Sequence, residues 1–396
     1  MAKLIILFIT AFVDMVGFAL VLPLLPYYAT RYGANALVVG LLVSSFSVAQ
    51  LAVAPLWGRA SDRYGRRPMI IAGLVLSAVA YVIFAFAGSV WVLLLSRVVQ
   101  GAGGGTIGVV QAYVADATRP DQRTKSLGWL SAVTSFGAVV GPAFGSVLDQ
   151  AAGRRAPGLA AAVLAAFIAA FAWRFLRESK EMRPSAALAP PPLTPGRTAL
   201  RRVVAHPNEP ASRLIWIYTI AIGAFYGTGP TMPLLLSARL GVTEHTIGYF
   251  FMYIGAMGVV ARAGLLGWVL GLLGEAWLTR LGAVFLASGL YLLSLAHGYG
   301  VLVTSMTLMP LGTAFVFPCV TGLLSQVVPS ADRGLYMGVQ QTFGGVSRVA
   351  FPVAAGFAMD AFGYGTPFWI AALLVLLTLP LTGAMAAYTA TTATGR

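Results

Sequence analysis

Two ionisable residues lie deep inside long apolar stretches of the sequence. Asp14 is in the stretch that begins at Leu4, and Arg97 is in the stretch from 90 to 115. A charged side chain at such a depth costs roughly 2.5–3.5 kcal/mol on membrane-insertion scales unless a partner satisfies it. Asp14 is the only carboxylate well inside an apolar stretch. Two interpretations stay open: Asp14 binds and releases a proton, or it is a structural carboxylate satisfied by Arg97 and neighbouring backbone groups.

Two more arginines interrupt apolar stretches in the second half of the sequence. Arg262 is near one end of its stretch, where a long side chain can extend to the membrane surface. Arg348 is deeper, between Gly345 and Pro352. It is expected either to contact an anionic group of a substrate or to serve the structure.

The composition requires that these residues be positioned by membrane helices. Of 396 residues, 58% are hydrophobic and 10% are charged, whereas soluble domains contain about 25% charged residues. The net charge of +14 would suggest nucleic acid in a soluble protein, but here the basic residues lie in short gaps between apolar stretches. We therefore expect the lipid bilayer as partner and no nucleic acid.

The cysteine and histidine content argues against a metal site, a cofactor and an enzyme. Cys319 is the only cysteine, so neither an intrachain disulfide nor a cysteine cluster can form. The three histidines, His206, His245 and His297, are scattered without the spacing of metal ligands. No nucleophile–base pair and no phosphate-binding loop of ATPases occurs. We predict no cofactor, no metal and no enzymatic activity.

The apolar stretches predict twelve membrane-spanning helices, because a bilayer core needs about 20 apolar residues per helix. An all-α polytopic fold follows. The expected spans are 5–28, 36–58, 69–88, 90–115, 126–148, 157–176, 214–238, 246–272, 277–297, 299–325, 334–358 and 366–388.

A proline-rich, charged segment divides these spans into two sets of six. We predict an N-terminal half at 1–176, a cytoplasmic linker at 177–213 and a C-terminal half at 214–396. Arg123 and Arg333, as well as Pro142 and Pro352, recur at one constant offset. Two parallel six-helix repeats with a substrate path between them are typical of one large transporter architecture.

Lysines and arginines predict the orientation of the chain. With the N-terminus in the cytoplasm, nineteen of them lie on the inner side. The outer side then holds only Arg31, Arg154, Arg155 and Arg239. The positive-inside rule therefore places both termini in the cytoplasm.

The loop after the second span and the stretch from 137 to 146 carry recognisable patterns. The loop reads GRASDRYGRRP from Gly58 to Pro68, which combines a helix end, a glycine turn and dense charge. The stretch reads GAVVGPAFGS, in which glycines recur every four residues and favour close helix packing. Without further context, the loop could be a basic membrane anchor and the glycines could be ordinary packing residues.

Together these motifs resemble the major facilitator superfamily, and most closely its twelve-helix drug:proton antiporters of the tetracycline-efflux type. The loop matches Gly-x-x-x-Asp-Arg/Lys-x-Gly-Arg/Lys-Arg/Lys, and Arg97-Val-Val-Gln100-Gly101 matches a helix-4 motif linked to proton transfer. Asp14 with Pro23 and Pro26 resembles the helix-1 pattern of the antiporters. The resemblance implies two pseudo-symmetric halves of six helices.

The resemblance also implies roles for particular residues. Asp14 and Arg97 would couple transport to protons, Asp62 would cap the helix expected at 334–358, and Arg66 would pair with Asp116 to hold the inner side shut. The full set of implied gating residues is Gly58, Asp62, Arg63, Gly65, Arg66, Arg67 and Asp116. The exporter motif of the family corresponds to Gly137, Gly141, Pro142 and Gly145, with Ser146 in place of the last glycine.

The expected function is proton-coupled export of small lipophilic or cationic compounds by alternating access, by a monomer in the inner membrane. Acidic residues of tetracycline exporters are missing from the third span, which argues against the metal chelate of tetracycline as cargo. The alternatives are a carrier of a lipid, sugar, zwitterion or anion, and a sensor that does not transport. Candidate substrate contacts are Asp14, Gln100, Phe225, Tyr226, Tyr253, Phe315 and Arg348.

Overall fold

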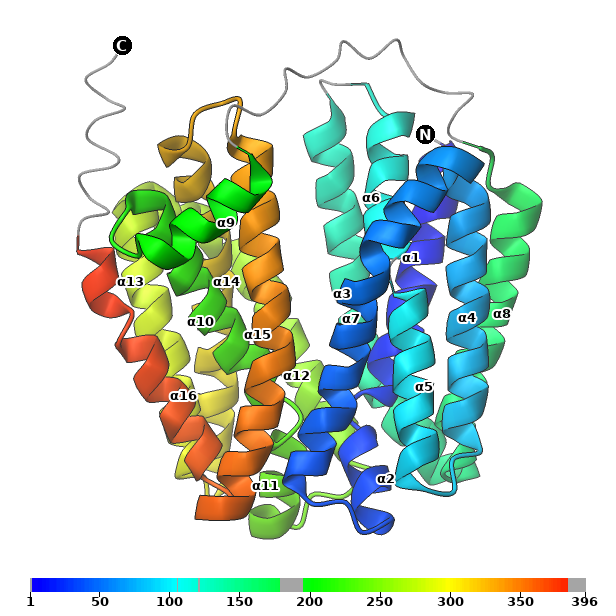
Figure 1. Cartoon of the computed structure of the whole chain (residues 1–396). Helices are drawn as coiled ribbons and strands as arrows, with labels where there is room; N and C mark the ends of the chain where they lie inside the picture. Colours follow the sequence, from blue (N-terminus) through cyan, green and yellow to red (C-terminus); the bar gives the residue numbers. More distant parts are fainter. Residues whose placement is uncertain (1, 105, 120–121, 179–194, 384–396) are drawn as a thin grey trace. The chain divides into compact units, whose positions relative to one another are not determined.

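The structure is a computed structural model that describes residues 2–104, 106–119, 122–178 and 195–383. Every regular element among these residues is a helix (Figure 1), so the predicted all-α fold is confirmed. The internal contacts divide the chain into two units, which are described separately. Among the described residues, the first unit comprises 2–104, 106–119, 122–178 and 241–256, and the second comprises 195–240 and 257–383.

The first unit is built mainly from the N-terminal helices of the chain. In it α1 packs against α7 and α8, and α4 packs against α5 and α8 (Figure 1). Most of α12, although it lies far along the sequence, belongs to this unit. The helices are α1 (Ala2–Val21), α2 (Leu25–Arg31), α3 (Ala36–Tyr64), α4 (Arg66–Ala85), α5 (Val90–Gly103), α6 (Thr106–Ala117), α7 (Arg123–Ala152), α8 (Arg155–Phe175) and α12 (Ile247–Val260).

The second unit is centred on α13, which packs along α14 and against α16, while α10 packs against α15. Gly282 and Gly312 let α13 and α14 approach closely, because a Cβ on Gly282 would lie 2.9 Å from the Gly312 carbonyl oxygen. The elements are α9 (Gly196–Ala205), α10 (Pro210–Thr228), α11 (Met232–Leu240), η3 (Ala261–Leu265), α13 (Leu266–Ser294), α14 (Tyr299–Val327), α15 (Arg333–Phe362), α16 (Thr366–Leu376) and η4 (Leu379–Thr382).

Local sequence signals explain several helix ends. The side chain of Asn35 accepts a hydrogen bond from the Val38 amide at the start of α3, and Ser89 does the same for Val92 at the start of α5. Gly65 ends α3 and precedes α4 with a φ of 107°, a left-handed conformation that favours glycine. The loop glycine is therefore required by the backbone.

Eight helical stretches within the described residues are long and apolar enough to cross a membrane. They account for nine of the twelve expected spans, because Ile247–Ser294 covers two of them. The other three expected spans are also helical, as α10 with α11, α15, and α16 with η4, although residues 384–388 lie outside the described part. These helices are not counted among the eight because they are shorter or, like α15 with Gln340 and Arg348, more polar.

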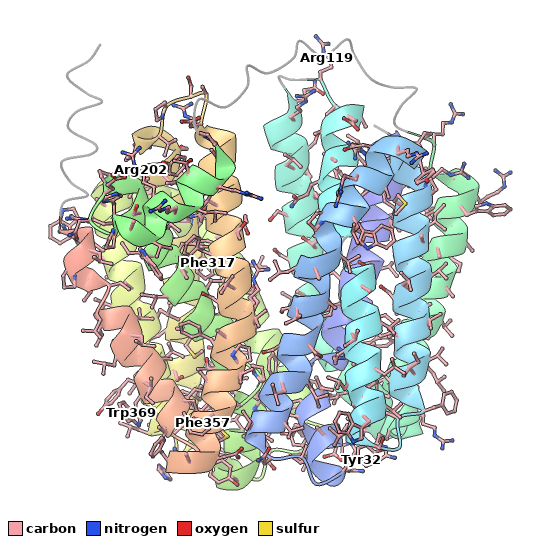
Figure 2. The ribbon with its side chains drawn as sticks, in the orientation of Figure 1. Tyr32, Arg119, Arg202, Phe317, Phe357 and Trp369 are labelled. Carbon is pink, nitrogen blue, oxygen red and sulfur yellow. The ribbon has the colours of Figure 1, made fainter. Side chains whose placement is uncertain are left out.

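Large apolar side chains point outward from the helices of both units. Trp91 is 78% exposed, and Phe167 and Trp173 are also largely exposed. Figure 2 shows Phe357 and Trp369 on the outside of the second unit. Such extensive apolar exposure is uncommon in soluble proteins and is expected where lipid is the solvent. The chain is a multi-pass membrane protein.

Candidate proton-coupling and gating sites

A polar cluster lies inside the first unit, around Asp14. Tyr81 of α4 accepts a 2.9 Å hydrogen bond at its hydroxyl from Nε2 of Gln100 on α5. The same tyrosine packs against Gly17 of α1, where a Cβ would lie 3.5 Å from its ring. It is within electrostatic range of both Asp14 and Arg97. The cluster therefore joins α1, α4 and α5 through one tyrosine, a residue that the sequence patterns did not indicate.

Arg97 is buried in this cluster with unused hydrogen-bonding capacity. Its guanidinium lies 5.4 Å from the centre of the Phe84 ring, and its Nε and Nη2 atoms have no hydrogen-bond partner. No residue that the structure describes forms an ion pair with it, so the proposed Asp14–Arg97 contact is not formed here. Two buried donors thus remain available to an acceptor that enters the cluster.

The exporter motif packs α7 directly onto α1, the helix that carries the carboxylate. A Cβ on Gly137 would lie 2.8 Å from the carbonyl oxygen of Phe12, and one on Gly141 would lie 2.7 Å from that of Val16. Gly145 meets the backbone of α1 in the same way. The three glycines are therefore needed for this helix contact.

Pro142 and Ser146, in the same motif, face α12 in the first unit. Pro142 lies inside α7. Its carbonyl oxygen is so close to Gly248 that a Cβ on Gly248 would not fit. Ser146 is buried, and its hydroxyl accepts a 3.0 Å hydrogen bond from the Gly248 amide. The serine at this position thus contributes a hydrogen bond that glycine could not make.

The loop between α3 and α4 is organised by Arg66. Its guanidinium pairs with Asp62 at 2.8 Å and with Asp116 of α6 at 3.2 Å. It also donates a hydrogen bond to the Ser61 hydroxyl. The structure thus brings together the pair that the family resemblance implied. The implied contact of Asp62 with the helix now seen as α15 concerns the other unit and stays a prediction.

The remaining gating candidates surround this pair. Gly58 lies in α3, and nothing would obstruct a Cβ there. The guanidinium of Arg63 lies 5.4 Å from the centre of the Tyr64 ring, and Arg67 donates a hydrogen bond to the carbonyl oxygen of Trp173 on α8. Arg67 therefore joins the loop to α8. Gly58 has no packing requirement within the described contacts.

An acid that sequence reasoning missed completes the loop. Glu178 follows α8 and accepts hydrogen bonds from the backbone amides of Arg66, at 2.9 Å, and Arg67, at 3.3 Å. These amides begin α4 and have no partner within the helix, so the carboxylate caps the helix and interacts favourably with its dipole. The only available signal was an acid just beyond a span, in a segment that resembled a linker.

The second unit holds three of the predicted substrate contacts near one another. Phe225 and Tyr226 of α10 are in edge-to-face contact, with ring centres 5.4 Å apart. The Arg348 guanidinium lies 5.9 Å from the Tyr226 ring centre and within electrostatic range of Tyr218. Nε of Arg348 is buried without a hydrogen-bond partner. Arg348 thus resembles Arg97 in having a buried nitrogen without a hydrogen-bond partner.

The other candidate contacts are placed differently. Phe315 is buried in a core cluster of the second unit with Ala261, Leu278, Ala314 and Cys319. Its burial is explained by packing alone. Tyr253 is partly buried and belongs to the first unit, and thus lies in a different unit from Arg348.

Comparison with known proteins identifies the family. The model of the Major Facilitator Superfamily matches residues 7–293 and 214–393. Multidrug resistance protein 1 of Bacillus subtilis (strain 168) is 28% identical over 379 residues, which cover 95% of this chain and 94% of that protein. Tetracycline resistance protein, class G, of Vibrio anguillarum is 28% identical over 391 residues, covering 93% and 94%.

Solved structures agree with these matches. The human organic anion transporter MFSD10 (TETRAN) has a TM-score of 0.69 and 25% identity, covering 96% of this chain and 98% of that one. The nucleoside transporter NupG has a TM-score of 0.75 at 13% identity and supports the fold alone. The predicted resemblance and the predicted fold are both confirmed. The chain is a membrane transporter of small molecules and belongs to the Major Facilitator Superfamily.

Proposed function

We propose that this transporter is a proton-coupled exporter of small lipophilic or cationic compounds that works by alternating access. The observation that carries the proposal is the position of Asp14. It lies on the helix against which the exporter-motif glycines pack, and it faces a cluster that contains Tyr81 and Arg97. The multidrug and tetracycline resistance proteins among its relatives support the same class of cargo.

One carboxylate can couple the movement of protons to the movement of cargo by electrostatics. Ionised Asp14 attracts a cationic or polarisable cargo, whereas protonated Asp14 has no charge with which to hold it. A proton from outside would therefore displace the cargo and favour return to the inward-facing state. Release of that proton to the cytoplasm would accompany loading. In this scheme Arg97 adjusts how readily Asp14 is protonated.

The loop around Arg66 would close the inner side of the transporter. Arg66 holds two acids from different helices, Asp62 on α3 and Asp116 on α6. Movement of α6 relative to α3 would separate these charges, so their pairing favours the closed arrangement. Substitution of Arg66 is expected to weaken that closure.

The orientation adopted in this scheme is an inner membrane with both termini in the cytoplasm and a monomeric transport unit. Figure 2 shows Arg119 at one end of the first unit and Tyr32 at the other. The junction of α3 and α4, where Arg66 and Arg67 begin α4, lies at the same end of the unit (Figure 1). The basic end would be cytoplasmic by the positive-inside rule.

The decisive test is proton flux in liposomes that contain the purified protein. A pH gradient is imposed, and lipophilic cations, neutral drugs, zwitterions and organic anions are added one at a time. We expect one of the cations or neutral drugs to collapse the gradient with the wild type. The Asp14→Asn variant should not respond, because asparagine cannot bind the proton.

The matched control is Glu209→Gln, which neutralises an acid that pairs with Arg202 outside the cluster. It should respond like the wild type. Equal responses of wild type and Asp14→Asn would mean that Asp14 is structural. If labelled cargo equilibrates without proton movement in any sample, the protein is an uncoupled facilitator.

A second candidate function is transport of organic anions or zwitterions. It is favoured by the unpartnered donors of Arg97 and Arg348, since a guanidinium with free N–H groups suits a carboxylate or phosphate. The relative described as an organic anion transporter supports it. In the same assay an anion would then be the active compound, and Arg348→Leu would abolish its transport.

A further inference from the structure

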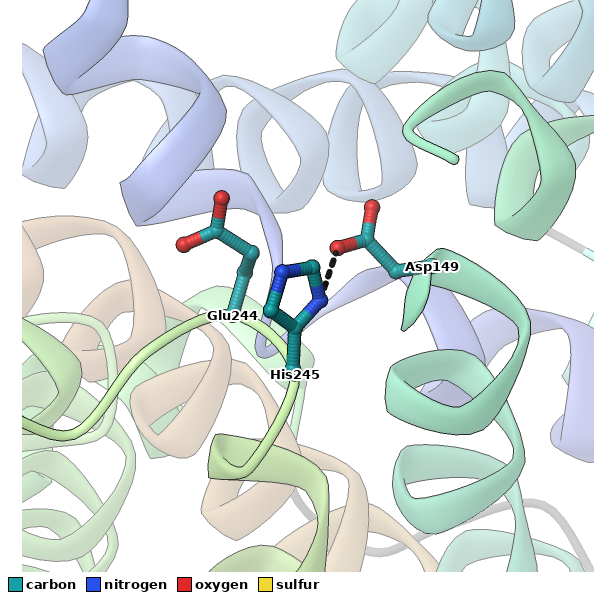
Figure 3. A group of neighbouring side chains, drawn as sticks. All are labelled: Asp149, Glu244 and His245. Carbon is teal, nitrogen blue, oxygen red and sulfur yellow. Dashed lines mark ion pairs between the residues drawn. The ribbon is translucent and has the colours of Figure 1, made fainter. Parts of the chain in front are cut away.

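A group of three metal-ligating side chains lies at the end of the first unit that is predicted to face outside. Asp149 comes from the last turn of α7, and Glu244 and His245 come from the loop that precedes α12. One candidate ligand atom of each residue lies within 4.8 Å of the others. Figure 3 shows the His245 ring between the two carboxylates. All three residues belong to the first unit, so their arrangement is defined within one body.

One carboxylate oxygen of Asp149 is held by a hydrogen bond, and the other faces His245. The residue is 4% exposed. Its Oδ1 accepts a 2.6 Å hydrogen bond from the hydroxyl of Tyr28, which is itself buried. Its Oδ2 lies 3.0 Å from Nδ1 of His245. A hydrogen bond to one oxygen of a ligating carboxylate is the usual way in which proteins orient a metal ligand.

His245 and Glu244 supply the other two candidate ligands. Nδ1 of His245 lies beside Oδ2 of Asp149, a contact that is an ion pair when the ring is protonated and that a metal ion would replace. Glu244 is mostly buried and uses Oε1 to pair with Arg31, which leaves Oε2 for another partner. The charges of the two carboxylates are offset by Arg31, which pairs with Glu244, and by Arg154, whose guanidinium lies 5.9 Å from the Tyr28 ring centre.

The loop is anchored on both sides of these residues. The Ser146 hydroxyl donates a 2.7 Å hydrogen bond to the carbonyl oxygen of Glu244 and accepts one from the Gly248 amide. The hydroxyl of Tyr27 donates a 3.0 Å hydrogen bond to the carbonyl oxygen of Val242. The backbone is thus fixed before and after Glu244 and His245, which reduces the ordering that a ligand would have to impose.

We propose that Asp149, Glu244 and His245 bind a divalent transition-metal ion, with Zn²⁺ as the best match. One imidazole nitrogen and two carboxylate oxygens suit Zn²⁺, and water or a further group would occupy the fourth position. Ligands on tetrahedral Zn²⁺ lie about 3.3 Å apart, close to the 3.0 Å between the His245 and Asp149 atoms. The imidazole disfavours Mg²⁺ and Ca²⁺, which take oxygen ligands. A bound ion would join the loop to α7.

The test is calorimetric titration of the purified full-length protein in detergent with ZnCl₂, MgCl₂ and CaCl₂. The protein is purified through an affinity tag without histidine, and no cargo is present. We expect one Zn²⁺ site per chain and no comparable Mg²⁺ or Ca²⁺ site. His245→Gln and Glu244→Gln should weaken Zn²⁺ binding at least tenfold. Tyr28→Phe should weaken it roughly tenfold, as expected for a group that orients a ligand.

His297→Gln is the matched control, because His297 is exposed in a loop of the second unit, where its Nδ1 lies 2.9 Å from the Leu295 carbonyl oxygen. It should bind Zn²⁺ like the wild type. His245→Gln is preferred over changes at buried Asp149, since its side chain is 45% exposed and the substitution should not prevent folding. Absence of Zn²⁺ binding in the wild type, or equal binding by wild type and His245→Gln, would overturn the proposal. Because no transport is measured, either result leaves the proposed function unaffected.

Discussion

Tyr81 shows how one uncharged side chain can organise a buried polar cluster. Its hydroxyl accepts a hydrogen bond from Nε2 of Gln100, and its ring packs against Gly17 of α1. It therefore links α1, which carries Asp14, with α4 and α5 through both packing and hydrogen bonding. Its loss should affect stability as well as transport.

We predict that Tyr81→Phe lowers the free energy of unfolding by about 1–3 kcal/mol, because Nε2 of buried Gln100 loses its partner. Thermal unfolding in detergent measures the effect. Tyr299→Phe is the control, because Tyr299 is 59% exposed and its change should be nearly neutral. An equal effect of the two substitutions would show that the Tyr81 hydroxyl contributes no net stability.

The Arg66 pair and the Asp149 group illustrate what sequence can and cannot predict about residues. Arg66 and Asp116 are brought together by a family motif, so their 3.2 Å contact could be expected. Glu178 and Tyr81 belong to no such motif. Their roles depend on contacts between residues distant in sequence, and the same applies to His245 and Asp149, whose histidine spacing gave no indication of a shared site.

At the scale of elements, the contact between α1 and α7 depends on the absence of side chains. Gly141 lies where a Cβ would be 2.7 Å from a backbone oxygen, and backbone cannot move as easily as a side chain. On the same helix, Gly128 faces open space. The two glycines therefore form a matched pair for testing the packing.

Gly141→Ala should destabilise the protein by about 1–3 kcal/mol, because α1 and α7 must separate to admit the methyl group. Gly128→Ala should be neutral or stabilising by up to about 1 kcal/mol, since alanine is the better helix former. Chemical unfolding followed by circular dichroism distinguishes them. If Gly141→Ala is also neutral, the helices can adjust at no cost and the motif serves something other than close packing.

The helices themselves were largely predictable, whereas their interruptions were not. Apolar stretches bounded by basic loops located helices close to the expected spans, although the end of the last span, 384–388, lies outside the described residues. The expected first span is divided into α1 and α2 near Pro23, and the fourth into α5 and α6 near Gly104. A π-helical turn at Ala261–Leu265 and Gly274 at a φ of 74° interrupt the region after α12. Hydrophobicity reports length and burial, but local backbone geometry depends on tertiary packing.

At the scale of the whole molecule, the orientation in the membrane can be tested with the single cysteine. Cys319 is buried, so replacing it with serine provides a cysteine-free background. New cysteines at His206, predicted to be inside, and at His297, predicted to be outside, report on the two sides. In intact cells a membrane-impermeant maleimide should label only the cysteine at 297.

Both sites should react after the cells are opened, which controls for exposure. Labelling of position 206 but not 297 in intact cells would reverse the predicted topology. The proposed direction of export would then need to be reconsidered, although the fold and the family would not change.

The assignment of Gly241–Ala256 to the first unit has a consequence for producing the chain as two separate fragments. A fragment that ends after α8 would lack the residues that cover Pro142 and Val139 of α7, because Gly248 and Gly255 supply that cover. Fragments divided within the proline-rich segment should therefore complement each other when produced together. The second fragment carries a piece of the first fragment's surface, so each half is expected to persist in cells only when its counterpart is made.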